Sequence, residues 1–126
     1  MEPKAVIFLK RTTLAAAILG LTAGAALADN FGAIAFSQTT GAYGYSFDMG
    51  SRRDAETRAM RECRSRSKNC QVAIWFKNAC GSVAIGANGW GSAWAGTRAN
   101  AERAARNNCS KHTSGCKVLA WSCTTR

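Results

Sequence analysis

Residues 101–109 of the chain read AERAARNNC, and residues 55–63, 46 positions earlier, read AETRAMREC. The same offset places further residues on partners of their own type. The matched pairs are Ala55 with Ala101, Glu56 with Glu102, Ala59 with Ala105, Cys63 with Cys109, Cys70 with Cys116, Val72 with Val118 and Trp75 with Trp121. Two cysteines and a tryptophan in one common register are hard to obtain by chance. The chain therefore predicts two copies of one supersecondary unit.

Each copy begins with the pattern of a β-hairpin. The first two strands are expected at 32–36 and 43–47, and again at 82–85 and 90–94, with Gly-containing turns between them. Aromatic residues alternate with small ones along each second strand, so all its rings share one face. We expect these aromatic faces to meet the alanine stripes of the helices, because large side chains fill space beside small ones.

A helix and a third strand complete each copy. Ser51 and Thr97 are the expected N-caps, and alanines recur on one face of the helix that follows each of them. The third strands, 70–76 and 116–123, are apolar on both faces, so we place them in the centre of a sheet. The predicted fold class is α+β. It has two pseudo-symmetric ββαβ repeats, about 31–80 and about 81–124, in which antiparallel strands pack with two Ala-rich helices.

The N-terminus has the composition of a secretory signal peptide. Basic residues precede an apolar run at 14–28, which ends in the small-x-small sequence Ala26-Leu27-Ala28. We expect cleavage after residue 28, a mature single domain at 29–126, and export to the periplasm or beyond the cell. An uncleaved anchor is the alternative. No second apolar stretch follows that could cross a membrane.

All six cysteines lie after the predicted signal peptide, which favours disulfides in an oxidising compartment. Symmetry suggests Cys63–Cys70 and Cys109–Cys116 as local bridges within each copy. Cys80 and Cys123 then remain, and we expect them to join the two copies. No CxxC occurs and His112 is the only histidine, so the sequence predicts neither a metal site nor redox catalysis, and no cofactor.

A strong positive charge is the main functional signal. Residues 29–126 carry 14 basic and 6 acidic side chains, a formal charge of +8, which favours encounters with polyanions. Arg58, Arg61 and Arg64 are spaced by three, opposite the alanine stripe, and form a candidate anion-binding surface. A merely solvated helix face is the alternative. No specific nucleic-acid signature accompanies these arginines.

Other candidate residues have structural alternatives. Trp90 could stack on a sugar or a base, or it could belong to the core. Glu56 and Glu102 could form a pseudo-symmetric acid pair, or each could accept from a backbone N–H or a nearby arginine. His112 is expected on the surface.

With these residues in view, the chain resembles a family of small exported bacterial proteins, domain-of-unknown-function family 4189. The resemblance runs from about Phe31 to Thr124. It is carried by the opening Gly-Ala-Ile-Ala, the Ala-Glu helices ending in Cys, the Val-x-x-Trp strands, and Asn-Ala-Cys-Gly at 78–81. It implies a secreted or periplasmic domain and supplies no catalytic residue set.

Together these observations predict a non-enzymatic binding module that uses its basic surface on an anionic envelope component or a protein partner. One alternative is a protein inhibitor or host-directed effector whose loops, 37–42 or 86–91, insert into a target. A weaker alternative is a hydrolase that uses Glu56 or Glu102.

Overall fold

A computed structural model describes residues 28–125 of the chain. The predicted signal peptide lies outside the described residues except for Ala28, and Arg126 also lies outside them. The elements are β1 (Phe31–Phe36), β2 (Tyr43–Met49), α1 (Arg52–Arg64), β3 (Gln71–Lys77), β4 (Cys80–Ile85), β5 (Trp90–Ala95), α2 (Arg98–Ser110) and β6 (Lys117–Cys123). This order is the predicted ββαβ unit used twice, so the α+β fold class is confirmed.

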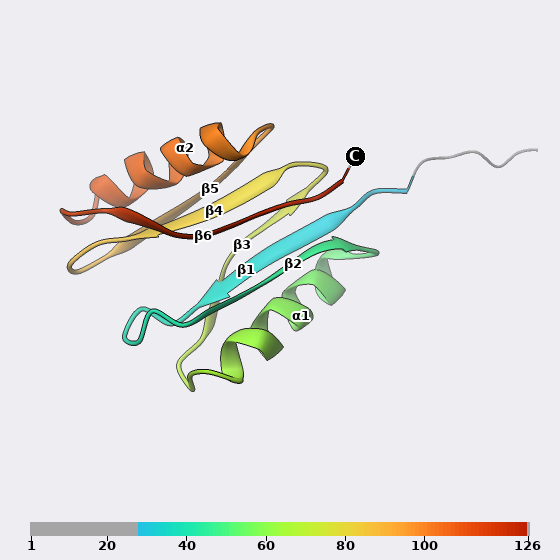
Figure 1. The fold of residues 1–126 in the computed structure, drawn as a ribbon, viewed down its shortest axis with the longest axis horizontal. Coiled ribbons are helices and arrows are strands. Elements are labelled where there is room, and N and C mark those ends of the chain that lie inside the picture. Colours follow the sequence, from blue (N-terminus) through green and yellow to red (C-terminus); the bar gives the residue numbers. More distant parts are fainter. Residues whose placement is uncertain (1–27, 126) are drawn as a thin grey trace, which may run out of the picture.

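The two copies form four layers (Figure 1). The first copy gives an antiparallel sheet in the order β2-β1-β3, and the second gives β5-β4-β6. The sheets face each other, with α1 outside the first sheet and α2 outside the second. The predicted central position of the third strands is therefore wrong, because β1 and β4 are the central strands. β3 and β6 are apolar on both faces because a helix covers one face and the opposite sheet covers the other.

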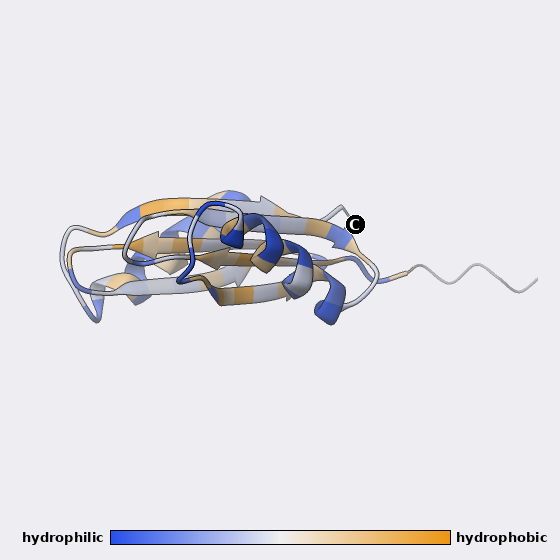
Figure 2. Cartoon of the chain, turned by 90° about the horizontal axis from the view of Figure 1, so that it is seen from below, coloured by the Kyte–Doolittle hydropathy of each residue, from blue (hydrophilic) through white to orange (hydrophobic). Residues whose placement is uncertain are grey.

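The main core lies between the sheets. Ile34 and Phe36 of β1 and Phe76 of β3 are buried against Val83 of β4 and Ala120 of β6. Smaller clusters fill the space between each helix and its own sheet, and each contains alanine from the helix stripe and a helix-terminal cysteine. Figure 2 shows the outer side of α1 as mostly hydrophilic, while hydrophobic residues concentrate along the strands.

Each helix packs on the small-residue face of its hairpin. A Cβ atom built on Gly44 would lie 2.3 Å from the carbonyl oxygen of Ala59, so the backbones of β2 and α1 are almost in contact. A Cβ atom built on Gly91 would clash in the same way with the backbone nitrogen of Cys109 on α2. The prediction that the aromatic faces meet the alanine stripes is therefore wrong. Small residues meet small residues here, and the rings point toward the opposite sheet.

Local signals at the helix ends act as expected. The Ser51 side chain accepts a hydrogen bond from the backbone N–H of Asp54, and Thr97 accepts one from Asn100, so both N-caps are confirmed. Both helices span 13 residues and bury the same stripe of two alanines and one cysteine. The helices are therefore matched elements on opposite outer layers of the molecule.

An extra residue interrupts each third strand. The register between β1 and β3 skips Ala73, and the register between β4 and β6 skips Leu119, which is the same place in the repeat. Such a bulge changes the alternation of side chains along the strand. It brings Val72 and Trp75, three positions apart, opposite Ala35 and Ala33, which both face α1. The Val-x-x-Trp pattern of the sequence thus records a bulge.

The three disulfides join Cys63 to Cys70, Cys109 to Cys116, and Cys80 to Cys123, which are the pairs expected from symmetry. The first two connect a helix end to the strand that follows. The expected role of the third was wrong: Cys80 and Cys123 are directly opposed partners in β4 and β6, so they cross-link one sheet and do not join the copies. Three disulfides indicate an oxidising, exported environment.

Candidate functional site

The outer face of α1 carries the predicted basic surface. Arg58, Arg61 and Arg64 are all exposed. The Arg58 Nε lies 3.1 Å from a carboxylate oxygen of Glu62, so its charge is partly neutralised. The side chains of Arg61 and Arg64 make no hydrogen bond or ion pair with the residues that the structure describes. Both line a shallow cavity of about 500 Å³, which extends from Met60 on α1 to Val72 on β3.

The matched helix lacks these three arginines. At the positions equivalent to Arg58, Arg61 and Arg64, α2 has Ala104, Asn107 and Ser110. The backbone, caps and buried stripe of the two helices are nevertheless the same. The fold therefore does not require arginine at these three positions, and this set of three arginines belongs to the first copy only, although α2 and the turn after it carry Arg103, Arg106 and Lys111 elsewhere.

Glu56 and Glu102 each accept from an arginine one turn earlier on their own helix. The Arg52 Nε lies 3.0 Å from Glu56, and the Arg98 Nε lies 3.0 Å from Glu102. Because α1 and α2 are on opposite outer layers, the two carboxylates do not share a cleft (Figure 1). Their geometry fits the structural alternative, in which each is the partner of a nearby arginine.

The same arginines stack on the tryptophans of the third strands. The Arg52 guanidinium lies 4.7 Å from the ring centre of Trp75, and Arg98 lies 3.8 Å from that of Trp121. Each copy therefore has an arginine at the start of its helix that contacts both a glutamate on the helix and a tryptophan on the third strand, β3 or β6. Exposed cation–π contacts contribute about 0.5–1 kcal/mol each, which explains why the repeat retains these residues.

Trp90 and His112 lie near the second hairpin turn. The Trp90 ring packs edge-on against Phe36, 5.0 Å between ring centres, and contacts the core cluster between the sheets. His112 is exposed. The turn itself is held to the loop after α2, since the backbone N–H of Asn88 donates to Thr113 and that of Ala87 donates to Ser114.

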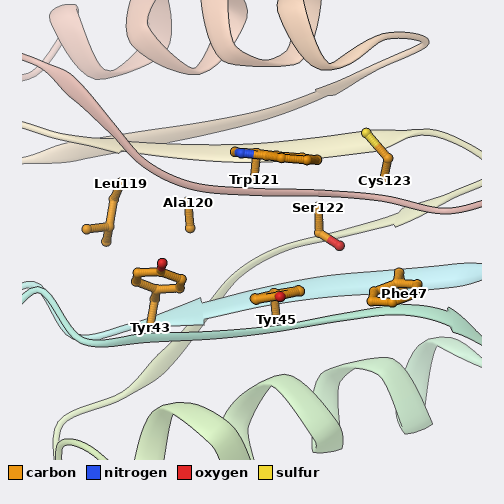
Figure 3. A pocket seen from close by; sticks show the side chains of 8 residues that line it. All are labelled: Tyr43, Tyr45, Phe47, Leu119, Ala120, Trp121, Ser122 and Cys123. Carbon is orange, nitrogen blue, oxygen red and sulfur yellow. The ribbon is translucent and has the colours of Figure 1, made fainter.

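Three exposed aromatic rings follow one another on β2, on the face that we expected from the sequence to meet the helix. Tyr43, Tyr45 and Phe47 are 37%, 41% and 52% exposed, and the rings of Tyr45 and Phe47 are nearly parallel, 6.4 Å apart. Together with residues 119–123 of β6 they line a groove of about 440 Å³, which we call the aromatic groove. In Figure 3 the three rings form a row along β2, and Leu119, Ala120 and Ser122 point toward them from β6.

A hydrogen bond across the sheets closes the inner side of the aromatic groove. The Ser122 hydroxyl donates to the backbone carbonyl of Ser46, over 3.0 Å. At one end, the backbone of Tyr43 and Tyr45 contacts the end of α1 and the turn after it. Arg66 donates to the Tyr43 carbonyl over 2.8 Å, and the Tyr45 N–H donates to Glu62 over 3.4 Å. Alternation along β2 shows that the rings share a face, but no signal along the chain pairs β2 with β6.

Comparison with known proteins supports the resemblance seen in the sequence. The family model described as "Domain of unknown function (DUF4189)" matches residues 31–123. The chain belongs to this family. A search of curated protein sequences found no match.

The fold of this DUF4189 domain is similar to a solved structure. The NMR structure of Rv1813c from Mycobacterium tuberculosis aligns with a TM-score of 0.50 and 23% sequence identity, over 96% of this chain and 99% of that chain. At this identity the similarity concerns the fold alone. It extends over both copies of the repeat.

Two further findings describe the DUF4189 domain. Within residues 28–125, no three His, Cys, Asp or Glu side chains lie close enough to hold a metal ion. No helix in that part of the chain has the length and apolar character needed to cross a bilayer.

Proposed function

We propose that this DUF4189 domain is a non-enzymatic binding module, exported to the periplasm or beyond the cell, that holds an anionic partner on the basic surface of α1. The observation that carries the proposal is the difference between the two helices. Arg61 and Arg64 are exposed and unpaired among the described residues, at positions where the same fold accepts Asn107 and Ser110 in the second copy. Charges that folding does not require are available for a ligand.

The surroundings of these arginines suit an anionic ligand. Five of the acidic side chains in residues 29–126 are already engaged by described groups. Glu56, Glu62 and Glu102 pair with arginines, Asp29 with Lys77, and Asp48 with the backbone and hydroxyl of Thr125. Glu56 also lines the cavity at Arg61 and Arg64, but its carboxylate is already paired with Arg52, which leaves these two arginines available for a ligand. The adjoining Met60 and Val72 would contact its apolar part.

Charge reversal tests the proposal. The variant Arg58→Glu/Arg61→Glu/Arg64→Glu is compared with Arg103→Glu/Arg106→Glu/Lys111→Glu, which changes the net charge equally but on the second copy. All six side chains are exposed, so both variants are expected to fold. Heparin and long-chain polyphosphate serve as probes in calorimetric titrations at low and moderate salt.

The α1 variant is expected to bind both probes at least about tenfold more weakly than the α2 variant, because three local charge contacts are lost. Binding by the unchanged chain should weaken as salt rises. Equal losses in the two variants would show that net charge alone controls the interaction. That result would refute a specific surface on α1.

A further inference from the structure

The exposure of the aromatic row on β2 is not explained by the fold. The equivalent positions in β5 are Trp90, Ser92 and Trp94, so the same strand accepts a serine where Tyr45 stands. Trp90 is also partly covered by Phe36, which leaves Trp94 as the one exposed ring of β5, in a separate groove shared with Trp75 of β3. Only β2 therefore presents three consecutive rings to solvent. Contiguous exposed apolar surface of this kind marks a binding site more often than chance.

The backbone of β2 argues against an added peptide strand as the ligand. The Tyr43 carbonyl already accepts from Arg66, and the Tyr45 N–H already donates to Glu62. A peptide that extended the sheet at this edge would have to displace both side chains. Capping of this kind is how proteins protect sheet edges from strand addition.

The lining of the aromatic groove argues against a nucleic acid. All eight lining residues are uncharged. Single-stranded nucleic acids bind where aromatic rings are combined with cations that follow the phosphates. Here the rings are present but no cation belongs to the lining, and Arg66 and Arg98, which border it, are already engaged by the Tyr43 carbonyl and the Trp121 ring. The ligand that fits is therefore flat, repeating and uncharged.

A neutral sugar chain has these properties. The face of an aromatic ring is electron-rich, and the axial C–H groups of a pyranose ring are electron-poor, so the two surfaces attract and exclude water together. The Tyr43 and Tyr45 hydroxyls can each donate to and accept from sugar hydroxyls. Because the rings follow a straight strand, with 6.4 Å between Tyr45 and Phe47, an extended chain fits better than a coiled one.

We infer that the aromatic groove is a binding site for an uncharged, extended polysaccharide, of the β-1,4-linked pyranose class. Successive sugar rings lie on Tyr43, Tyr45 and Phe47, and β6 forms the opposite wall. The site is on a different layer from Arg61 and Arg64, so it does not depend on the anionic partner proposed for α1.

The experiment titrates the purified chain with cellohexaose, chitohexaose, maltohexaose and a dT oligonucleotide, by calorimetry and by tyrosine and tryptophan fluorescence. We expect at least one of the two β-1,4-linked hexasaccharides to bind, more tightly than the coiled α-1,4-linked maltohexaose. Tyr45→Ala should weaken that binding about tenfold or more, since one stacking ring is lost. Tyr45→Phe should retain most of it.

Trp94→Ala is the matched control, because it removes an exposed ring at the position equivalent to Phe47 but on the opposite edge. It should leave the affinity unchanged, whereas Phe47→Ala should weaken it. All four substitutions are at exposed side chains, and thermal melting verifies that each variant folds. The proposal is overturned if neither β-1,4-linked hexasaccharide binds, if Tyr45→Ala binds as well as the unchanged chain, or if only the oligonucleotide binds.

Discussion

The substitution Gly44→Ala tests the packing that turns the aromatic row outward. The backbone at Gly44 is not in the left-handed region, so alanine is acceptable to the strand itself. The obstacle is α1. An added Cβ would lie 2.3 Å from the Ala59 oxygen and 2.5 Å from the Cys63 nitrogen. Both are helix backbone atoms, so no side-chain rotation relieves the clash.

The size of the effect follows from these distances. Carbon atoms are in favourable contact at about 3.5–4.0 Å, so α1 or β2 must move by about 1 Å. The Cys63–Cys70 disulfide ties the C-terminal end of α1 to the turn before β3, which restricts that movement. Overpacking typically costs about 1–3 kcal/mol, and we expect about 3 kcal/mol here. In a domain of this length, that lowers the melting temperature by about 12–24 °C.

Thermal unfolding followed by circular dichroism, together with urea titration, measures the change. Gly50→Ala is the control, because an added Cβ there meets nothing within 4 Å. We expect it to be neutral or to stabilise by up to about 1 kcal/mol, through the unfolded chain. If the Gly44→Ala and Gly50→Ala variants have the same melting temperature, then α1 does not lie against β2 as described. This packing would then not explain why the rings point away from the helix.

Two further stability predictions concern the disulfides and the first helix cap. Replacing Cys80 and Cys123 by alanine should lower the free energy of unfolding by about 4 kcal/mol, because this bridge closes a separation of 43 residues. Replacing Cys63 and Cys70 should lower it by only about 2 kcal/mol, because that bridge closes a separation of 7 residues. Urea titration checks this order, and the reverse order would contradict the loop-entropy argument. Ser51→Ala should lower the free energy of unfolding by about 1 kcal/mol, because the Asp54 N–H loses its acceptor. A melting temperature equal to that of the unchanged chain would contradict this prediction.

Much of the fold is predictable because its signals are local and occur twice. The caps depend on residues three apart, as in Ser51 and Asp54, and the helical stripes on residues four apart. The local disulfides depend on a cysteine at the end of each helix and another at the next strand. Each pattern is visible in one copy and checked by the other. The repeat then gives the element order without any knowledge of long-range contacts.

Local patterns could not predict which face of the second strand meets the helix and which meets the opposite sheet. Alternation shows that Tyr43 and Tyr45 share one face and Gly44 the other, but not which face meets the helix. The rule that large residues pack on small ones pointed to the wrong side. It failed because glycine also permits close backbone approach, and alanine on α1 allows the same approach. When two faces made of small residues meet, the backbones of strand and helix pack directly against each other. The large residues of the strand then lie on its opposite face.

The position of a strand in its sheet is hidden for a related reason. An apolar pattern on both faces reports contact with the layers above and below the sheet, and it does not report hydrogen-bonded strands on both sides. In a four-layer arrangement the edge strands β3 and β6 also contact a helix on one face and the opposite sheet on the other. The aromatic groove follows from this, because β2 and β6 are edge strands of different sheets. The Ser122 hydroxyl and the Ser46 carbonyl that link them are 76 residues apart in the chain.

The duplication acts as an internal comparison between folding and function. Where the copies agree, as at Gly44 and Gly91, the residue is required by a contact that both halves make. Where they differ, as at Arg61 and Asn107, the shared backbone tolerates either residue, so the difference needs another cause. Arg61 and Arg64, whose positions hold Asn107 and Ser110 in the second copy, and the unbroken aromatic row, with Tyr45 at its centre, are both features of the first copy. We therefore expect ligand contacts to concentrate there, while the second copy mainly completes the shared core and the opposite wall of the groove.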